Sequence, residues 1–350
     1  MKRYGETPSL QQKLLPFHQP KNRGIRIGAR KLIVFTGGQP MKILSLALPL
    51  LLLGFFTGTS YGFVKTVKDV DLQLYLGTWY EIASTQPVFQ KNCLCTQANY
   101  SPKTDGNIKV ENYCIRGSLD GDVSNIEGVA KPAKRPGALK VSFGGPAFFA
   151  NYLIADLAPD YSWVVVSGPF GSPLWILSRT PSLEADVLDS IYDRLERRWL
   201  KPSRLVSTVR EGCPATNGSI AEELGRTGNF SILLEAVAAA GLGETLESLD
   251  AATILAPTNA AFEALGQETL EAVLGDVDVL RNILLYHVVV GVKANSQTVK
   301  TLDQIDMANG GVVAITLEGG RILVNDSKVV VANIQATNGV IHAIDKVLLP

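Results

Sequence analysis

The fold of the first large region is decided by two strings, Gly77-Thr78-Trp79-Tyr80-Glu81-Ile82 and Trp175-Ile176-Leu177-Ser178-Arg179-Thr180-Pro181. The first string opens a predicted strand, and the second closes one about a hundred residues later. Between residues 74 and 175, short stretches of alternating polarity are separated by turn residues such as Ser101-Pro102-Lys103-Thr104-Asp105-Gly106. This spacing predicts an antiparallel sheet that curls until its first and last strands meet, which makes a closed barrel.

Residues 73–213 resemble the lipocalins, in particular those of the apolipoprotein D and bacterial outer-membrane type. Gly77, Trp79 and Arg179 carry the resemblance, and further strings follow in the expected order: Asn99-Tyr100-Ser101, Leu139-Lys140-Val141-Ser142-Phe143 and Gly212-Cys213-Pro214. The resemblance implies an all-β, eight-stranded antiparallel barrel with a C-terminal helix. It also implies that Gly77, Trp79 and Arg179 close one end of the barrel structurally, and that the cavity holds one small apolar ligand.

A helix is predicted to follow the barrel and to open at Pro181. Its apolar residues share one face and should pack on the outside of the barrel: Leu183, Val187, Leu188, Ile191, Tyr192 and Leu195.

The pattern changes after Cys213, where a polar linker over residues 214–218 precedes Ala- and Leu-rich helical segments. Residues 219–350 resemble a fasciclin domain, through the strings Thr253-Ile254-Leu255-Ala256-Pro257-Thr258-Asn259-Ala260-Ala261-Phe262, Leu284-Leu285-Tyr286-His287 and Asn338-Gly339-Val340-Ile341-His342-Ala343-Ile344-Asp345. Independently of the family, Thr258 suits the cap of a helix that begins at Asn259, and Gly319-Gly320 suits a tight turn between β-rich runs. Helices followed by hairpins predict an α+β module.

The N-terminal sixty residues read as targeting sequence. Met41-Lys42, the apolar run 43–56 and the small residues 57–60 have the three parts of a signal peptide, so that the barrel domain spans residues 61–213. The apolar run is shorter than the ~20 residues of a membrane-spanning helix. The basic extension 1–40 is either an upstream mis-start or a transit peptide. We expect a secreted or periplasmic protein, or one of the plastid lumen if residues 1–40 form a transit peptide.

Charge argues against a nucleic-acid partner. Residues 1–40 hold eight Lys and Arg against the single acid Glu6, which leaves 25 basic and 32 acidic residues from 41 to 350. The folded part is therefore net acidic and is predicted to lack a large basic patch.

Four cysteines, Cys93, Cys95, Cys114 and Cys213, lie in the barrel region, and an exported chain should oxidise them. Four cysteines allow three pairings, and strand parity puts Cys93 and Cys95 on the same side, which disfavours a bond between these two. The lipocalin resemblance implies a Cys95–Cys213 bridge and leaves Cys93 to pair with Cys114. A zinc site is the rival interpretation, but the sequence has no C-x-x-C and no nearby His.

A ligand-binding barrel needs inward side chains that are mostly apolar with a few polar ones. Strand parity turns Trp175 and Leu177 inward, and the resemblance adds Tyr100, Asn112 and Trp175, with Val110 sharing the parity of Asn112. The resemblance also implies that four aromatic residues lie at the entrance: Phe143, Phe148, Phe149 and Tyr152. The alternative is that these side chains only fill the core of the barrel.

Glu81 shares the parity of Trp79, so its carboxylate is predicted to point inward. Three roles are open to it: an acid catalyst, a partner for the polar end of a ligand, or a structurally bonded group. No paired His and acid occurs in the barrel region, whose sequence contains no His at all. We therefore expect a binding protein without cofactor or metal, and a lipid- or carotenoid-modifying enzyme is the alternative.

The function expected from these observations is that of an exported carrier of a small hydrophobic ligand such as a fatty acid, lysolipid, sterol or carotenoid-like molecule. The fasciclin module would mediate adhesion to a membrane surface, matrix or protein partner. Within it, Tyr286-His287 resembles a dipeptide associated with receptor contact, and the alternative is a buried Tyr beside a hydrogen-bonded His. A purely adhesive protein with a structural barrel is a further alternative.

Overall fold

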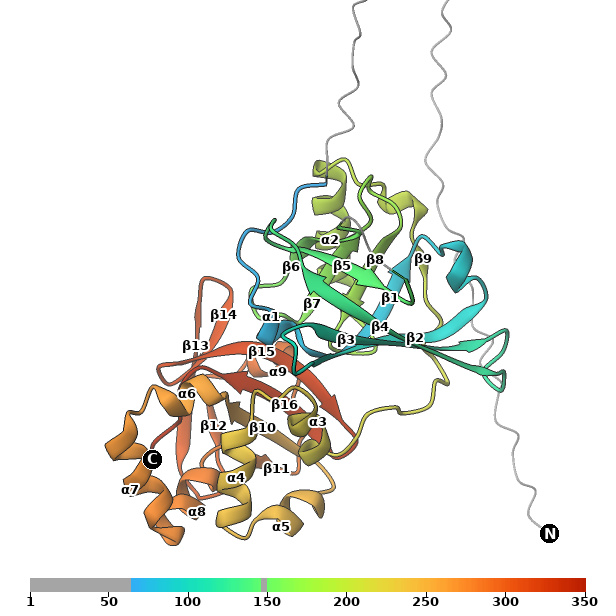
Figure 1. The fold of residues 1–350 in the computed structure, drawn as a ribbon. Helices are drawn as coiled ribbons and strands as arrows, with labels where there is room; N and C mark the ends of the chain where they lie inside the picture. The colour runs from blue at the N-terminus through green and yellow to red at the C-terminus, as the bar shows by residue number, and fades with distance from the viewer. Residues whose placement is uncertain (1–63, 146–149) are drawn as a thin grey trace, which may run out of the picture. The chain divides into compact units, whose positions relative to one another are not determined.

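The structure, a computed structural model, describes residues 64–145 and 150–350 (Figure 1). The predicted extension 1–40 and signal peptide 41–60 lie outside the described residues, as do Phe148 and Phe149. In these two described ranges, no helix has the length and hydrophobicity needed to cross a bilayer.

The first half of the described chain is an eight-stranded antiparallel barrel. Its strands follow one another around the sheet, and β1 pairs with both β2 and β8, which closes the barrel. The strands are β1 Gly77–Ser84, β2 Cys93–Pro102, β3 Ile108–Arg116, β4 Val123–Pro132, β5 Ala138–Ser142, β6 Tyr152–Leu157, β7 Trp163–Ser167 and β8 Leu174–Ser178. A short ninth strand, β9 (Val206–Ser207), adds to the far end of β1. The predicted barrel is thus confirmed.

One end of the barrel is closed by a buried guanidinium on an indole ring. Arg179 and Trp79 are both buried, and the guanidinium carbon lies 3.8 Å from the centre of the Trp79 ring. Helix α1 (Leu72–Tyr75) crosses this end, and Arg179 donates hydrogen bonds of 2.8–3.2 Å to four carbonyls around it: those of Leu74, Tyr75, Leu76 and Thr78. Burial lowers the pKa of Arg179 to about 9, so the side chain stays charged at neutral pH.

The glycine of the first string is required by this plug. Gly77 has a φ of +94°, and a Cβ added there would lie 3.3 Å from Nη1 of Arg179. A larger residue would be strained in its backbone and crowd the guanidinium, which explains why Gly, Trp and Arg occur together.

Two disulfides staple the barrel half. Cys93 is bonded to Cys114 on the neighbouring strand, and Cys95 is bonded to Cys213 in the segment that follows the barrel. This is the pairing that the lipocalin resemblance implied. Simple strand parity does not hold at these cysteines, however, because β2 is irregular between Leu94 and Gln97 and Cys95 has a φ of +57°.

The predicted helix after the barrel starts later than expected. Helix α2 spans Ala185–Arg197 rather than beginning at Pro181. Thr180 binds Ser178 through its N–H and the carbonyl of Ser182 through its hydroxyl, and these bonds hold residues 178–182 in a turn. As predicted, Ile191 and Leu195 are buried against the outer faces of β6, β7 and β8.

The second half is an α+β module, as predicted. Its seven-stranded sheet has the order β11-β10-β16-β15-β14-β13-β12, in which β10 and β16 are parallel and the other pairs are antiparallel. The helices are α3 Ile220–Arg226, α4 Ser231–Ala239, α5 Gly243–Glu247, α6 Asn259–Glu263, α7 Gln267–Gly275, α8 Val277–Leu285 and α9 Ser296–Val299. The strands are β10 Ala252–Pro257, β11 Val288–Val290, β12 Gln304–Asp306, β13 Val312–Glu318, β14 Arg321–Val324, β15 Ser327–Ala336 and β16 Gly339–Ile344.

Local signals in the sequence determine where several of these elements begin. Ser219 and Glu222 form a capping box at α3, and the Thr258 hydroxyl accepts from the N–H of Ala261 at the start of α6. Gly319 and Gly320 both have positive φ and form the tight turn between β13 and β14.

Candidate functional site

The interior of the barrel holds a cavity of about 340 Å³. Its walls come from β1, β2, β3, β5, β6, β7 and β8 and from the segments at the open end of the barrel. The lining residues are Glu81, Phe89, Gln90, Thr96, Gln97, Ala98, Tyr100, Val110, Asn112, Val141, Phe143, Asn151, Tyr152, Val166, Gly168, Pro169, Pro173, Trp175 and Leu177. The set is largely apolar and aromatic with a few amides, which is the usual composition of a small-molecule site.

The structure places seven of the nine predicted ligand residues on this wall: Tyr100, Val110, Asn112, Phe143, Tyr152, Trp175 and Leu177. The other two, Phe148 and Phe149, lie outside the described residues. The barrel therefore brings together side chains from four strands and one rim segment that are up to 77 residues apart in the chain. That these residues contact a ligand stays a prediction.

A chain of three phenols lies at the inner part of the cavity. Tyr100 donates to the Tyr152 hydroxyl at 2.9 Å, and the hydroxyls of Tyr152 and Tyr75 are 2.6 Å apart. Burial raises the pKa of Tyr100 to about 12 and raises those of Tyr75 and Tyr152 well above their ordinary value. All three are therefore protonated at neutral pH. The three hydroxyls carry three protons, and their two hydrogen bonds use two of these. When Tyr75 donates to Tyr152, the proton left over is that of the Tyr152 hydroxyl, and Tyr152 lines the cavity.

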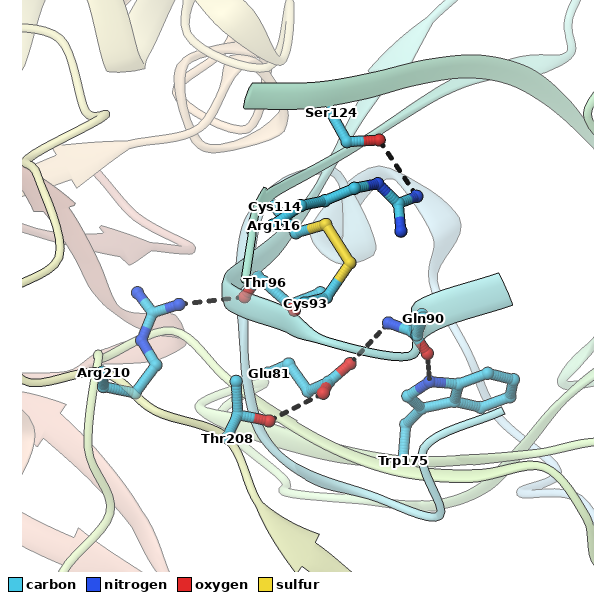
Figure 2. Close-up of a disulfide and its surroundings, with 10 residues drawn as sticks. All are labelled: Glu81, Gln90, Cys93, Thr96, Cys114, Arg116, Ser124, Trp175, Thr208 and Arg210. Atoms are coloured by element: carbon cyan, nitrogen blue, oxygen red, sulfur yellow. Dashed lines mark hydrogen bonds between the residues drawn. A yellow bond between two sulfur atoms is a disulfide. The ribbon is translucent and has the colours of Figure 1, made fainter. Parts of the chain in front are cut away.

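Near the open end, Gln90 is held between two strands of the barrel (Figure 2). Its amide nitrogen donates to Oε2 of Glu81 at 2.8 Å, and its amide oxygen accepts from the indole nitrogen of Trp175 at 2.7 Å. The other carboxylate oxygen of Glu81 accepts from the Thr208 hydroxyl at 2.7 Å. Gln90 ends a short 3-10 helix, η1 (Val88–Gln90), so these bonds fasten the β1–β2 connection over the cavity.

Glu81 faces the cavity, as its parity predicted, and both of its carboxylate oxygens already accept hydrogen bonds. Of the three roles that the sequence left open, this arrangement corresponds to the structurally bonded group. It lies two residues beyond Trp79 on β1, beside the η1 segment.

One residue of the cavity wall has a polar atom without a bonding partner among the described residues. The hydroxyl oxygen of Thr96 is buried and makes no hydrogen bond there, although the carbonyl of the same residue accepts from Arg210 at 2.9 Å. A buried hydroxyl without a partner costs free energy, but this oxygen has no surface accessible to water and so does not face the open cavity.

The rim of the cavity depends on a second glycine. A Cβ on Gly128 of β4 would lie 2.5 Å from the Ser142 carbonyl oxygen and 2.6 Å from the ring of Phe143. Only glycine leaves room for Phe143, which is 40% exposed and lines the cavity.

Sequence reasoning missed several wall residues. Alternation along β2 from Tyr100 gives Ala98 and Thr96, but Gln97 reaches the wall as well because the register of this strand shifts between Leu94 and Gln97. Phe89 and Gln90 belong to a 3-10 segment, where neither strand nor helix periodicity applies. Nothing in the sequence around Phe89 and Gln90 marks this segment as part of the site.

In the fasciclin-like half, Tyr286 and His287 are buried. The Tyr286 hydroxyl donates to the Val312 carbonyl, while His287 bonds the Ile283 carbonyl through Nδ1 and accepts the Leu348 N–H through Nε2. Burial lowers the pKa of His287 to about 4. The dipeptide is thus placed in the interior, which corresponds to the alternative of a buried Tyr beside a hydrogen-bonded His.

Comparison with known proteins identifies a family for each half of the chain. A family model described as a lipocalin-like domain matches residues 70–209, and one described as a fasciclin domain matches residues 228–350. The chain is 38% identical over 148 residues to the outer membrane lipoprotein Blc of Vibrio cholerae, a match that covers 41% of this chain and 84% of that protein. It is 30% identical over 167 residues to temperature-induced lipocalin-1 of Arabidopsis thaliana, with 46% and 90% covered.

The second half has its own relative. Over 133 residues the chain is 36% identical to transforming growth factor-beta-induced protein ig-h3 of Sus scrofa, which covers 38% of this chain and 19% of that longer protein. These matches agree with the closed barrel, its Trp79–Arg179 plug and the α+β module. The chain belongs to the lipocalin family, and a fasciclin domain follows its lipocalin barrel.

Proposed function

We propose that the barrel binds one small hydrophobic molecule that carries a polar group, such as a fatty acid, lysolipid, sterol or carotenoid-like compound. The observation that carries this proposal is the cavity of about 340 Å³, lined by Tyr100, Trp175 and Leu177 among other apolar side chains. Small-molecule pockets have volumes of about 300–1,000 Å³, so this one suits a slender ligand. Removing an acyl chain from water contributes ~0.8 kcal/mol per methylene, and ten methylenes offset much of the entropic cost of association.

The polar group has one place to bind. The Tyr152 hydroxyl can offer its spare proton to a carbonyl or carboxylate of the ligand. A molecule with an apolar body and one oxygen-bearing end therefore fits this wall better than a plain hydrocarbon.

The proposed setting is outside the cytoplasm. All four cysteines form disulfides, a state typical of secreted and periplasmic proteins. The name of the Vibrio cholerae relative, outer membrane lipoprotein, fits the same kind of compartment. In this setting the fasciclin domain would serve adhesion or binding to a partner.

The alternative function is that of an enzyme acting on a lipid or carotenoid held in the barrel. Glu81, the carboxylate on the cavity wall, has both oxygens bonded to Gln90 and Thr208, which favours a structural role over proton transfer. In residues 64–145 and 150–350, no cluster of three or more His, Cys, Asp or Glu suits a metal ion.

The test begins with the exported protein purified from its own host and examined by native mass spectrometry. An intact co-purified lipid supports carriage, a chemically altered lipid supports the enzyme, and an empty barrel that takes up no added fatty acid overturns the proposal. Fatty-acid titration then compares Trp175→Ala with Lys109→Ala, a surface residue that pairs with Glu111 and Glu127. We expect the first variant to lose about 1–3 kcal/mol of binding free energy, and the second almost none. Equal affinity in both would exclude Trp175 from the site.

A second pair of variants separates ring contact from fastening of the η1 segment. Trp175→Phe keeps an aromatic ring on the wall but loses the indole N–H that Gln90 accepts. Gln90→Ala removes the fastening altogether. If the segment holds the ligand in place, both variants should raise the dissociation rate more than they lower the association rate.

A further inference from the structure

The backbone conformation and the exposure of Trp199 are not explained by packing within the fold. Helix α2 ends in a Schellman motif, in which the N–H of Trp199 bonds the Glu196 carbonyl and the N–H of Leu200 bonds the Leu195 carbonyl. The residue at the position of Trp199 in this motif adopts the left-handed conformation and is usually glycine. Here φ is +61°, and the Trp side chain is 93% exposed. The chain thus accepts backbone strain to present a large indole to the surroundings.

The segment that follows Trp199 runs along the open end of the barrel. Leu200 lies against the β7–β8 connection, because a Cβ on Gly171 would be 3.2 Å from its side chain. Val206 pairs with Ser84 at the end of β1, directly before the connection that carries η1. Both connections line the mouth of the cavity, through Phe89 and Pro169. Residues 199–206 therefore follow the rim of the mouth.

Large apolar side chains are exposed on the same rim. Val88 is 91% exposed, Phe89 65% and Phe170 80%, and Phe170 directly follows the cavity residue Pro169. At the opposite end, the turns 103–107 and 133–137 expose no large apolar side chain. These exposed apolar residues lie at the mouth, although Ile126 on β4 and Val209 are exposed elsewhere on the barrel half.

The rim also carries basic charge. Between residues 194 and 204 there are five Arg and Lys and one acid, Glu196, although the folded part as a whole is net acidic. Arg194 and Arg198 pair with Asp156, while three exposed basic residues have no ion pair among the described residues: Arg197, Lys201 and Arg204. The folded part was expected to lack a large basic patch, but three basic side chains are exposed together in this segment.

We propose that this rim, made of Val88, Phe89, Phe170, Trp199 and the three unpaired basic residues, docks on an anionic lipid bilayer. A Trp flanked by Arg and Lys suits the membrane–water interface, where the indole lies among the headgroups and the cations bind lipid phosphate and carboxylate. Docked in this way, the mouth of the cavity opens onto the bilayer. Apart from Phe89, the side chains proposed for docking lie outside the ligand site. Membrane docking can therefore be lost while ligand binding is kept, and ligand binding can be lost while docking is kept.

The test measures co-sedimentation of the full exported chain with phosphatidylcholine vesicles, with and without phosphatidylserine. We expect binding to the anionic vesicles that weakens as salt is added. Trp199→Asn should weaken it about tenfold while leaving the melting temperature unchanged or higher, because Asn tolerates the left-handed conformation. Arg197→Gln/Lys201→Gln/Arg204→Gln should weaken it roughly a hundredfold at low salt.

Matched controls lie away from the rim. Leu317→Asn removes an exposed apolar residue from β13, and Lys103→Gln/Lys134→Gln removes two exposed lysines from turns at the closed end of the barrel. Neither should change vesicle binding. The proposal is overturned if the parent chain ignores anionic vesicles, if Trp199→Asn binds them as the parent does, or if Trp199 instead holds a dimer in sedimentation that the variant loses.

Discussion

The two halves of the molecule hold themselves together by different means. The barrel half keeps a cavity of about 340 Å³ open in its interior, whereas the cavity beside His287 in the fasciclin half measures about 80 Å³. Space that is left open loses the packing contacts that a filled core would make. The barrel half carries both disulfides and the buried Arg179, and the fasciclin half contains no cysteine. The half that holds the binding cavity thus contains the disulfide cross-links, and the half with the more completely filled interior contains none.

This contrast can be measured because all four Trp residues lie in the barrel half, at positions 79, 163, 175 and 199. Trp fluorescence therefore follows unfolding of the barrel alone, while hydrogen exchange read by mass spectrometry follows each half separately. Each prediction below tests one side of the contrast.

The largest effect is expected from the disulfides. Cys95–Cys213 spans 118 residues and Cys93–Cys114 spans 21. In the chain-entropy account, Cys95→Ala/Cys213→Ala should cost the barrel about 5 kcal/mol and Cys93→Ala/Cys114→Ala about 3 kcal/mol. Denaturant unfolding followed by Trp fluorescence measures both, and the fasciclin half should be unaffected. Equal losses in the two variants would contradict the dependence on loop length.

The next effect concerns the charged plug. Arg179→Met keeps the apolar volume but leaves the carbonyls of Leu74, Leu76 and Thr78 without their donor, so the barrel should lose about 4 kcal/mol of unfolding free energy. Arg179→Lys should fall between this variant and the parent, because it keeps the charge without the planar fork. A loss below about 1 kcal/mol in Arg179→Met would show that apolar packing on the Trp79 ring suffices without the charge and its hydrogen bonds.

Acid should act on the other half. His287 and His342 are both buried, and burial lowers the pKa of each, that of His287 to about 4. Because the folded-state pKa of His287 lies below the unfolded value of about 6.5, its contribution is present above pH 6.5 and is lost as the pH falls toward 4, by about 3 kcal/mol. Hydrogen exchange at pH 7 and pH 4.5, corrected for intrinsic rates, should show protection falling in residues 219–350 first. The barrel half has no His in residues 64–213, and an equal loss of protection there would refute the assignment.

The sequence allowed the barrel to be predicted because closure needs few special residues. Gly77, Trp79 and Arg179 form one physical unit. Strand alternation then assigns Trp175 and Leu177 to the wall, and the lipocalin resemblance adds Tyr100. Hydrophobic periodicity of this kind reflects one buried face and persists across a whole strand.

The features that escaped prediction are those in which the backbone leaves regular geometry. The irregular stretch of β2 brings Gln97 to the wall and gives Cys95 a positive φ, and η1 has too few residues to show a period. The start of α2 was misplaced because side-chain bonds of Ser178 and Thr180 compete with helix formation after Pro181. Gln90 was missed for a related reason, since its role arises from a bond to Glu81 across the β1–β2 connection and from a bond to Trp175, which is 85 residues away in the chain.

The smallest effect is expected from separating the halves. Every wall residue of the cavity lies between Glu81 and Leu177, so the ligand site draws no side chain from the fasciclin domain. We expect the 219–350 fragment to unfold cooperatively on its own and to show no lipid affinity. The 61–213 fragment should keep its ligand affinity within about threefold of the intact chain, a change of about 0.7 kcal/mol or less. Calorimetry of the fragments and fatty-acid titration measure both. A much larger loss of affinity would mean that the fasciclin domain helps to build the site, and the division into a carrier half and an adhesion half would have to be abandoned.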